Sequence, residues 1–278
     1  MGMSSSISRG WKAALAVAAA AALTVGLAGP SGAAARNGAI TWVDQCVSSV
    51  PVSPFPGEVA HYGCVINSAW ARDGVHVAIV TEDLDDPAQG ALFLLDSVTA
   101  EIDYLGAVDL PSTVSFSPGG TRIAAARGGN IVIVDAATGA TVRTLTKSAG
   151  VESDPSWSVS GTHIAYVTSA GVRRVKAAGG GDWLMIPGAD FVQYSPGGHR
   201  LGFTKDGVVY RSWLNGSNAV AVTTVPDPGR PAFAWSPDDR FLVVPDVDGG
   251  LLVVTRAGAP VSIAGGGGAK FPSWQPIP

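Results

Sequence analysis

Residues Phe116–Gly120 read Phe-Ser-Pro-Gly-Gly, and closely related segments occur at Tyr194–Gly198 and Trp235–Asp239. In each segment an aromatic residue is followed by a tight turn, because proline presets φ for a turn and glycine supplies a positive φ. Two further copies, Trp70–Gly74 and Trp157–Gly161, keep the aromatic residue and the final glycine but lack the proline. These five segments are copies of one repeated unit, and the predicted fold follows from this repeat.

The spacing of the copies predicts the architecture. A sixth aromatic residue, Trp274, follows the fifth copy, and successive aromatic residues are 46, 41, 37, 41 and 39 residues apart. A period near 40 is about the length of one four-stranded β-propeller blade. Seven and nine residues after each aromatic residue lie two apolar residues, which a strand would bury on one face. These pairs are Val77 and Ile79, Ile123 and Ala125, Ile164 and Tyr166, Leu201 and Phe203, and Leu242 and Val244.

The last copy has only its first strand, and the N-terminal region resembles the strand that it lacks. Ile40–Val43 matches Ile164–Val167, which is the second strand of another copy. We therefore expect the strand at Pro272–Pro276 to pair with Ile40–Val43 in a mixed blade, which would remove an open sheet edge. The predicted fold is all-β: a six-bladed β-propeller over residues 36–278, closed by this mixed N- and C-terminal blade and preceded by a signal peptide.

Residues 1–35 are the predicted signal peptide. Arg9 and Lys12 precede an apolar run from Ala13 to Ala28, and Ala33–Ala35 fits the small-x-small pattern of a cleavage site. The run is marginal for a bilayer core of about 30 Å, so we expect cleavage, with an uncleaved N-terminal anchor as the alternative. After cleavage we expect a secreted or extracytoplasmic protein of the cell envelope, with no stable membrane span.

The two cysteines, Cys46 and Cys64, are expected to form a disulfide, since exported proteins fold in an oxidising compartment. They would face each other across an outer hairpin of the mixed blade, formed by residues 47–52 and 58–65. In the chain-entropy model a disulfide that closes such a loop stabilises a protein by about 3 kcal/mol.

Charge and histidine placement exclude two classes of site. The formal net charge of −4 becomes −6 when the two basic residues of the signal peptide are removed, which argues against a nucleic-acid partner. His76 and His163 occupy a repeat position at which other copies carry Arg122 and Arg200. A position that accepts either residue is typical of a polar strand start, so we predict no metal site and no cofactor.

The repeated segment resembles the repeats of TolB-like, WD-repeat-like propellers. The resemblance rests on the pattern aromatic-Ser-Pro-Gly/Asp-Gly/Asp before a short apolar strand, is closest at Phe116, Tyr194 and Trp235, and extends over residues 37–278. It implies a six-bladed propeller and, from the periplasmic member of the family, a role in docking other proteins.

Acidic residues before the innermost strands form a candidate binding site. In a propeller, the loops that lead into these strands gather on one face around the central channel. The acidic residues at these places are Asp109, Glu152, Asp154, Asp190 and Asp227. We predict that they form a docking surface for a small cationic ligand or a basic partner segment, with ordinary solvated loops as the alternative.

No catalytic residue is predicted. Peptidases that carry such a propeller need a Gly-x-Ser-x-Gly elbow, which the sequence lacks, and Ser160 occupies an ordinary turn position of the repeat. We expect a monomeric, non-catalytic scaffold that binds a protein or a ligand. Two alternatives stay open: a small-molecule enzyme of the lactonase or lyase type with a channel metal, and a cell-wall glycan-binding module. Trp183 and Trp213 lie outside the aromatic positions of the repeat and favour the glycan alternative, although packing between blades explains them too.

Overall fold

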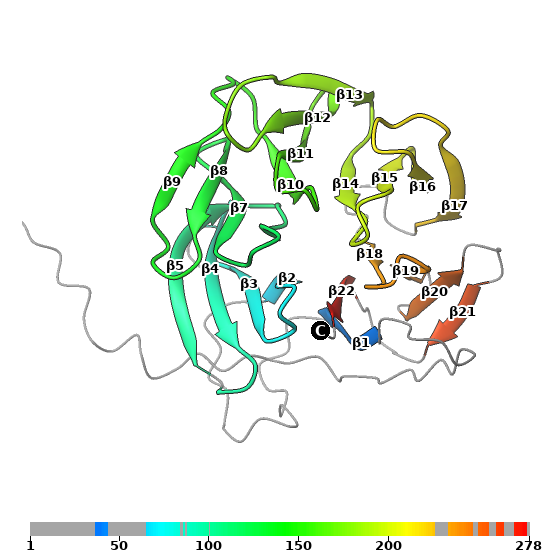
Figure 1. Cartoon of the computed structure of the whole chain (residues 1–278), viewed down its shortest axis with the longest axis horizontal. Coiled ribbons are helices and arrows are strands. Elements are labelled where there is room, and N and C mark those ends of the chain that lie inside the picture. The colour runs from blue at the N-terminus through cyan, green and yellow to red at the C-terminus, as the bar shows by residue number, and fades with distance from the viewer. Residues whose placement is uncertain are drawn as a thin grey trace, which may run out of the picture.

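The protein is a ring of antiparallel β-sheets around a central opening (Figure 1). The computed structural model describes residues 37–43, 65–83, 86, 88–99, 101–225, 233–246, 250–255, 260–263 and 270–276. Every element in these ranges is a β-strand, which confirms the all-β propeller architecture. Within the same ranges no helix is long and apolar enough to cross a membrane.

Five of the sheets have four strands each and form the blades. Blade I consists of β2 (Val65–Trp70), β3 (His76–Glu82), β4 (Gln89–Asp96) and β5 (Ile102–Asp109). Blade II consists of β6 (Ser115–Phe116), β7 (Arg122–Arg127), β8 (Asn130–Asp135) and β9 (Thr141–Thr144). Blade III consists of β10 (Ser153–Trp157), β11 (His163–Thr168), β12 (Gly171–Lys176) and β13 (Trp183–Pro187). Blade IV consists of β14 (Phe191–Tyr194), β15 (Leu201–Lys205), β16 (Val208–Ser212) and β17 (Val220–Thr224). Blade V consists of β18 (Ala234–Trp235), β19 (Phe241–Pro245), β20 (Leu251–Thr255) and β21 (Pro260–Ile263).

Within each blade the strands pair in chain order. The first strand lies next to the central opening and the fourth lies on the outside (Figure 1). The aromatic residue of each repeat is the last residue of the innermost strand, at the ends of β2, β6, β10, β14 and β18. The turn that follows in the repeat therefore lies beside the central opening in every blade.

The sixth sheet has two strands, β1 (Asn37–Val43) and β22 (Lys270–Pro276). These two strands pair as predicted, with Ile40 opposite Trp274, and β22 contacts β2 of blade I and β18 of blade V. The prediction of six full blades is wrong, because the described residues form five four-stranded blades and one two-stranded sheet. Part of the predicted outer hairpin is used elsewhere, since Val65 begins β2 and pairs with Thr81. The rest of that hairpin, Cys46, Cys64 and the signal peptide lie outside the described residues.

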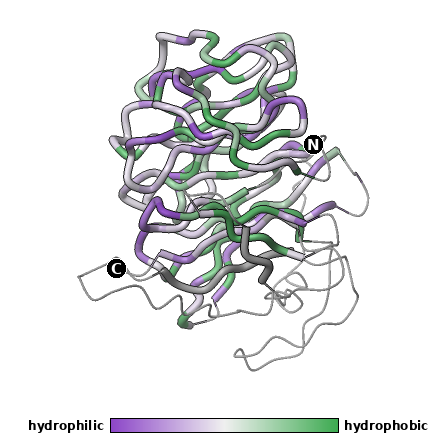
Figure 2. Tube along the Cα trace, turned by 90° about the vertical axis from the view of Figure 1, so that its right-hand side faces the viewer, coloured by the Kyte–Doolittle hydropathy of each residue, from purple (hydrophilic) through white to green (hydrophobic). Residues whose placement is uncertain are grey.

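The core lies between neighbouring blades. All ten residues of the predicted apolar pairs are buried. In β7, Ile123 and Ala125 pack against blade I, whereas Ala124 and Ala126 pack against blade III. Alternate residues of one strand thus face opposite neighbours, as the period of two requires. The side view in Figure 2 shows short hydrophobic and hydrophilic stretches following one another along the chain.

Candidate ligand-binding site

The innermost strands surround a central cavity of about 350 Å³. Residues from all five blades and from β22 line it, so its wall is assembled from segments far apart in the sequence. Most of the lining side chains are apolar or aromatic, with a few uncharged polar groups such as Asn67, Thr113 and Gln193. A concave wall that combines apolar and aromatic side chains with polar groups is typical of ligand-binding pockets.

Serine side chains connect neighbouring innermost strands. The Ser115 hydroxyl accepts a hydrogen bond from the backbone N–H of Trp157 at 3.0 Å, and the Ser156 hydroxyl accepts one from Tyr194 N–H at 2.9 Å. Each bond joins one blade to the next at the residue before the repeated aromatic. These bonds fix the spacing of the strands, so the cavity wall is preformed.

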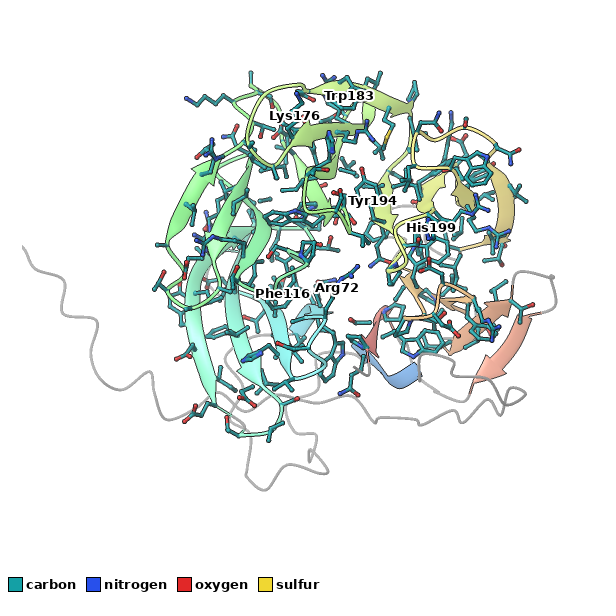
Figure 3. All side chains as sticks on the ribbon, in the orientation of Figure 1. Arg72, Phe116, Lys176, Trp183, Tyr194 and His199 are labelled. Carbon is teal, nitrogen blue, oxygen red and sulfur yellow. The ribbon has the colours of Figure 1, made fainter. Side chains whose placement is uncertain are left out.

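Arg72 reaches across the ring. Its Nη2 donates a hydrogen bond of 2.8 Å to the carbonyl oxygen of Pro196, which joins blade I to blade IV. In Figure 3 the Arg72 side chain points into the central opening. Two residues after the repeated aromatic, other copies carry Val159, Pro196 or Pro237, which also line the cavity. Arg72 is the only charged side chain among the described residues of the cavity wall.

The turn that carries Arg72 is held on two sides. The Asp73 carboxylate accepts hydrogen bonds from Val75 N–H at 2.8 Å and His76 N–H at 2.9 Å, and it lies 2.7 Å from the imidazole Nδ1 of His76. Burial raises the pKa of Asp73, but the hydrogen bonds from His76 and Val75 outweigh it and lower the pKa. Gln275 Nε2 donates to the Gly74 carbonyl at 2.9 Å, which ties the turn to β22. The backbone at Arg72 is therefore ordered by hydrogen bonds on both sides of the turn.

Two of the acidic residues predicted to form a docking surface bind backbone of the fold. Asp109 accepts hydrogen bonds from the N–H groups of Gly128 at 3.0 Å and Gly129 at 2.7 Å, so it joins the end of β5 to a turn of blade II. Glu152 is only 2% exposed and accepts hydrogen bonds from the Thr146 hydroxyl and, at 3.2 Å, from Ile131 N–H. Both carboxylates thus have partners inside the protein.

Asp154 and Asp190 lie at the start of adjacent innermost strands, Asp154 within β10 and Asp190 just before β14. Asp154 accepts a hydrogen bond from Thr113 N–H at 2.9 Å and one from the Ser153 hydroxyl, and Asp190 accepts one from the Thr204 hydroxyl. Asp227 lies outside the described residues. The structure thus gives all four described acidic residues internal partners, and their role in docking stays a prediction.

Asp154→Asn is expected to raise the stability of the protein at pH 7, because it removes a charge that burial disfavours. Burial, together with Asp190, raises the pKa of Asp154 above 3.8, although its hydrogen bonds act in the opposite direction. The folded state therefore holds the proton more tightly than the unfolded state, and the stability that this provides is lost as the pH rises above 3.8. Asparagine removes the charge, keeps an acceptor for Thr113 N–H and tolerates the φ of +50°.

Asp109→Asn is the matched control for this substitution. Its two oxygens accept from two different N–H groups, and an amide can accept only one of those bonds, so we expect a loss of about 1–2 kcal/mol. Urea unfolding between pH 4 and 8 measures both variants. A loss of stability in Asp154→Asn that matches the loss in Asp109→Asn would contradict the assignment of Asp154 as a partly buried, destabilising charge.

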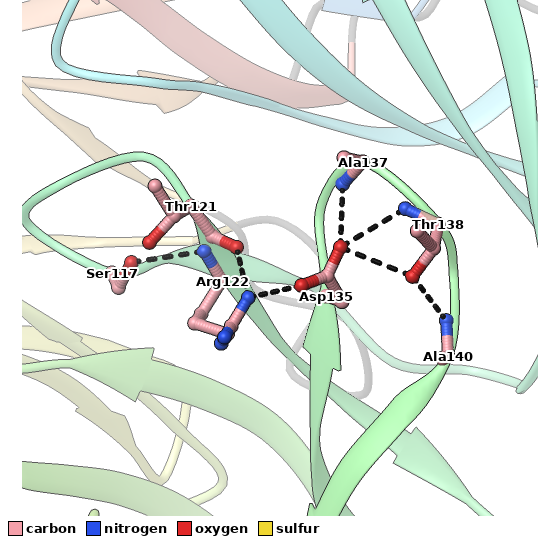
Figure 4. Close-up of polar contacts among 7 residues, drawn as sticks. All are labelled: Ser117, Thr121, Arg122, Asp135, Ala137, Thr138 and Ala140. Atoms are coloured by element: carbon pink, nitrogen blue, oxygen red, sulfur yellow. Dashed lines mark hydrogen bonds and ion pairs between the residues drawn. The ribbon is translucent and has the colours of Figure 1, made fainter.

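Strand pairing explains the repeat position that carries histidine or arginine. The first residue of the second strand faces the last residue of the third strand in the pairs His76 and Asp96, Arg122 and Asp135, and His163 and Lys176. In blade II the guanidinium of Arg122 contacts the Asp135 carboxylate, whose other oxygen accepts hydrogen bonds from the turn at Thr138 (Figure 4). This position therefore connects strands within a blade.

Trp183 and Trp213 are each paired with an arginine. The guanidinium carbon of Arg174 lies 4.3 Å from the ring centroid of Trp183, and that of Arg200 lies 3.7 Å from the ring centroid of Trp213. Trp183 is partly buried, whereas Trp213 is 46% exposed. In each of these tryptophans, one face of the indole ring is therefore covered by a guanidinium in a cation–π contact.

Solved structures share this fold. No protein-family model matches the sequence, and no curated protein matches it either. TolB from Acinetobacter baumannii aligns with a TM-score of 0.68 and 18% identity over 86% of this chain and 66% of that chain. A chain of a nidogen–laminin complex aligns with a TM-score of 0.64 and 7% identity over 85% of this chain and 97% of that chain. A putative TolB from Agrobacterium tumefaciens aligns with a TM-score of 0.57 and 18% identity over 79% of this chain and 92% of that chain. These likenesses establish the β-propeller fold and agree with the TolB-like resemblance of the repeat.

The central cavity and Arg72 were missed by the sequence reasoning. The signal for Arg72 was present, because the copy at Trp70–Gly74 departs from the repeat at the position where proline is usual. That departure was read only as a weaker match to the repeat. The cavity itself had no local signal, since its wall combines residues from all the innermost strands.

Proposed function

We propose that this protein is an exported, non-catalytic binding scaffold that takes a ligand, or a segment of a partner protein, into its central cavity. The observation that carries this proposal is the preformed cavity, because its volume lies within the range of about 300–1,000 Å³ typical of ligand pockets. The likeness to TolB and to a chain of a nidogen–laminin complex supports a protein-binding role. The N-terminal sequence supports a location outside the cytoplasm, with the Cys46–Cys64 disulfide as part of the same proposal.

The chemistry of the cavity favours binding over catalysis. General acid–base catalysis uses groups such as histidine or a carboxylate, whose protonation changes near the working pH. In the described part of the cavity wall the one charged side chain is Arg72, and an arginine stays protonated in proteins. The described residues also contain no group of three histidine, cysteine or acidic side chains that could hold a metal ion. These observations support the scaffold over an enzyme with a channel metal.

Val159→Trp tests the cavity as the binding site. Val159 lines the cavity at the end where the repeated turns lie, so a larger side chain there would occupy space that a ligand needs. We expect the variant to fold and to retain about one tenth or less of the ligand that the wild-type protein captures from its own envelope fraction. Crosslinking and mass spectrometry of the captured material measure this.

The control is Val142→Trp, which adds the same side chain at a 51% exposed position on β9. Its capture should match that of the wild-type protein. Equal capture by the folded Val159→Trp variant would refute the cavity as the binding site. Stoichiometric calcium or zinc in the purified protein would favour the enzyme alternative instead, and capture of envelope glycans that depends on Trp213 would favour the glycan-binding alternative.

A further inference from the structure

The described wall of the central cavity carries a single charge, and this charge is positive. Its described lining combines aromatic and aliphatic side chains, prolines, and neutral polar groups. Arg72 is the exception, at a position of the repeat where the other cavity-lining copies carry valine or proline. The acidic residues Asp154 and Asp190 lie at the opposite ends of the innermost strands and are hydrogen bonded within the protein. Arg72 therefore places a positive charge in the cavity wall at this end, where the carboxylates of Asp73 and Asp239 in the adjoining turns accept hydrogen bonds from backbone N–H groups.

The Arg72 guanidinium has donor capacity to spare. A guanidinium has five N–H donors in one plane. Within the described residues its hydrogen bond to the Pro196 carbonyl accounts for one of them. That bond holds the guanidinium plane of Arg72 across the cavity mouth. The hydrogen bonds to the Asp73 carboxylate order the backbone of the turn that carries Arg72. The other donors are then available to an acceptor inside the cavity.

We propose that the ligand of the central cavity carries a carboxylate, which the guanidinium of Arg72 binds. This inference rests on the proposed function of the cavity and adds the chemical class of its ligand. A planar guanidinium matches the two oxygens of a carboxylate, and a single positive charge matches a monoanion better than a doubly charged phosphate. The remaining surface, aromatic and aliphatic with neutral hydrogen-bonding groups, suits an uncharged and partly apolar body behind the carboxylate.

Three probes of nearly the same shape test the charge preference: benzoate, benzamide and benzamidinium, with charges of −1, 0 and +1. Titrations are followed through the indole N–H signals of the tryptophans in the cavity wall, Trp70, Trp157, Trp235 and Trp274, with Trp183 and Trp213 as reference signals outside it. We expect benzoate to bind about tenfold more tightly than benzamide, because one charge-assisted interaction is added at a solvent-accessible site. Benzamidinium should bind most weakly.

Substitutions of Arg72 then test whether this residue causes the preference for benzoate over benzamide. Arg72→Gln should bind benzoate and benzamide equally, and Arg72→Lys, which keeps the charge but not the planar fork, should retain part of the preference. Arg143→Gln is the matched control, since Arg143 also donates to a carbonyl of another blade, Ala178 O at 3.0 Å, but lies outside the cavity wall. It should bind the probes as the wild-type protein does.

The outcomes separate this inference from the proposed function. Equal binding of the three probes to the wild-type protein, a preference for benzamidinium, or a benzoate preference that survives in Arg72→Gln would overturn the carboxylate while leaving the cavity as a binding site. Failure of all three probes to shift the cavity tryptophans would overturn the carboxylate inference, whereas the cavity as a binding site is refuted only by equal capture in Val159→Trp. The order of the probes on the wild-type protein decides the charge preference even where a variant folds poorly.

Discussion

Replacing Gly139 by alanine is expected to destabilise the protein by about 3–4 kcal/mol. Gly139 lies in the turn after β8 with φ at +71°, where a side chain costs about 1–2 kcal/mol through strain alone. A Cβ atom there would also lie 2.7 Å from the backbone Cα of Leu105 and closer still to its carbonyl oxygen. Leu105 belongs to β5 of blade I, so the added carbon would push two blades apart.

The surroundings of Gly139 give this contact little freedom to relax. Arg127 donates from Nη1 to the Gly139 carbonyl at 3.1 Å and from Nη2 to the Leu105 carbonyl at 2.8 Å, which clamps the two backbones together. Leu105 itself is buried in the core shared by blades I and II. A shift of either backbone would therefore break hydrogen bonds or disturb packing, so the structure cannot relax around the added carbon at low cost in free energy.

Gly120→Ala is the control that separates the cost of backbone strain from the cost of the steric overlap at Gly139. Gly120 has the same φ of +71°, but a Cβ atom there would meet nothing within 4 Å. We expect this variant to lose about 1 kcal/mol, the cost of the left-handed backbone alone. Urea unfolding of both variants gives the difference directly. If the two losses were equal, the close approach of blades I and II at Gly139 would contribute nothing to stability.

The repeat allowed most of the blade architecture to be predicted from the sequence. Ile123 and Ala125 were placed on one buried strand face from their spacing alone, and both are fully buried. The pairing of the strand at Pro272–Pro276 with the strand at Ile40–Val43 was also predicted correctly, although the two lie at opposite ends of the propeller sequence. Both predictions rest on local patterns that repeat, so a strand recognised in one copy of the repeat identifies the equivalent strand in another copy.

Predictions that depended on contacts between different copies were less successful. The sixth four-stranded blade was expected to use residues up to 65, but Val65 is taken up by β2, where it pairs with Thr81. Sequence position put Asp109 beside the channel, yet it could not reveal that two N–H groups of the neighbouring blade converge on its carboxylate. Contacts of this kind depend on how one blade sits against the next, which no single repeat encodes.

Arg72 illustrates how a repeat can still point to a binding residue. In a repetitive fold most conspicuous residues build blades, as the connected pair Arg122 and Asp135 does. A residue that differs from those at the equivalent positions of the other copies does not serve the structural purpose that those residues share. Arg72 replaces the valine or proline of the equivalent positions and reaches the cavity. Departures from the repeat are therefore a better guide to function here than its recurring residues.

Glu152→Ala is expected to lower the stability of the protein by about 3 kcal/mol, because a buried hydrogen-bonded group and its volume are lost together. Glu152 is 2% exposed, and its Oε2 accepts from the Thr146 hydroxyl and from Ile131 N–H. The Ile131 N–H would keep one acceptor, the Thr146 hydroxyl at 2.9 Å, but that hydroxyl would lose its own. The loss would fall where β8 begins, next to the fully buried Ile131.

Two control substitutions decide whether Glu152 acts as a binding residue or as part of the fold. Glu152→Gln keeps an acceptor oxygen and nearly the same volume, so its loss should be about 1 kcal/mol, and Glu101→Ala at an exposed position should change stability by no more than about 0.5 kcal/mol. Thermal and urea unfolding measure all three. A Glu152→Ala variant as stable as Glu101→Ala would show that the carboxylate is dispensable to the blade, and its place on a docking surface would then become the better explanation. A large loss that glutamine mostly restores would instead mean that Glu152 holds the loop into β10 against blade II, and that any docking surface at this end of the channel depends on acidic residues nearer the solvent.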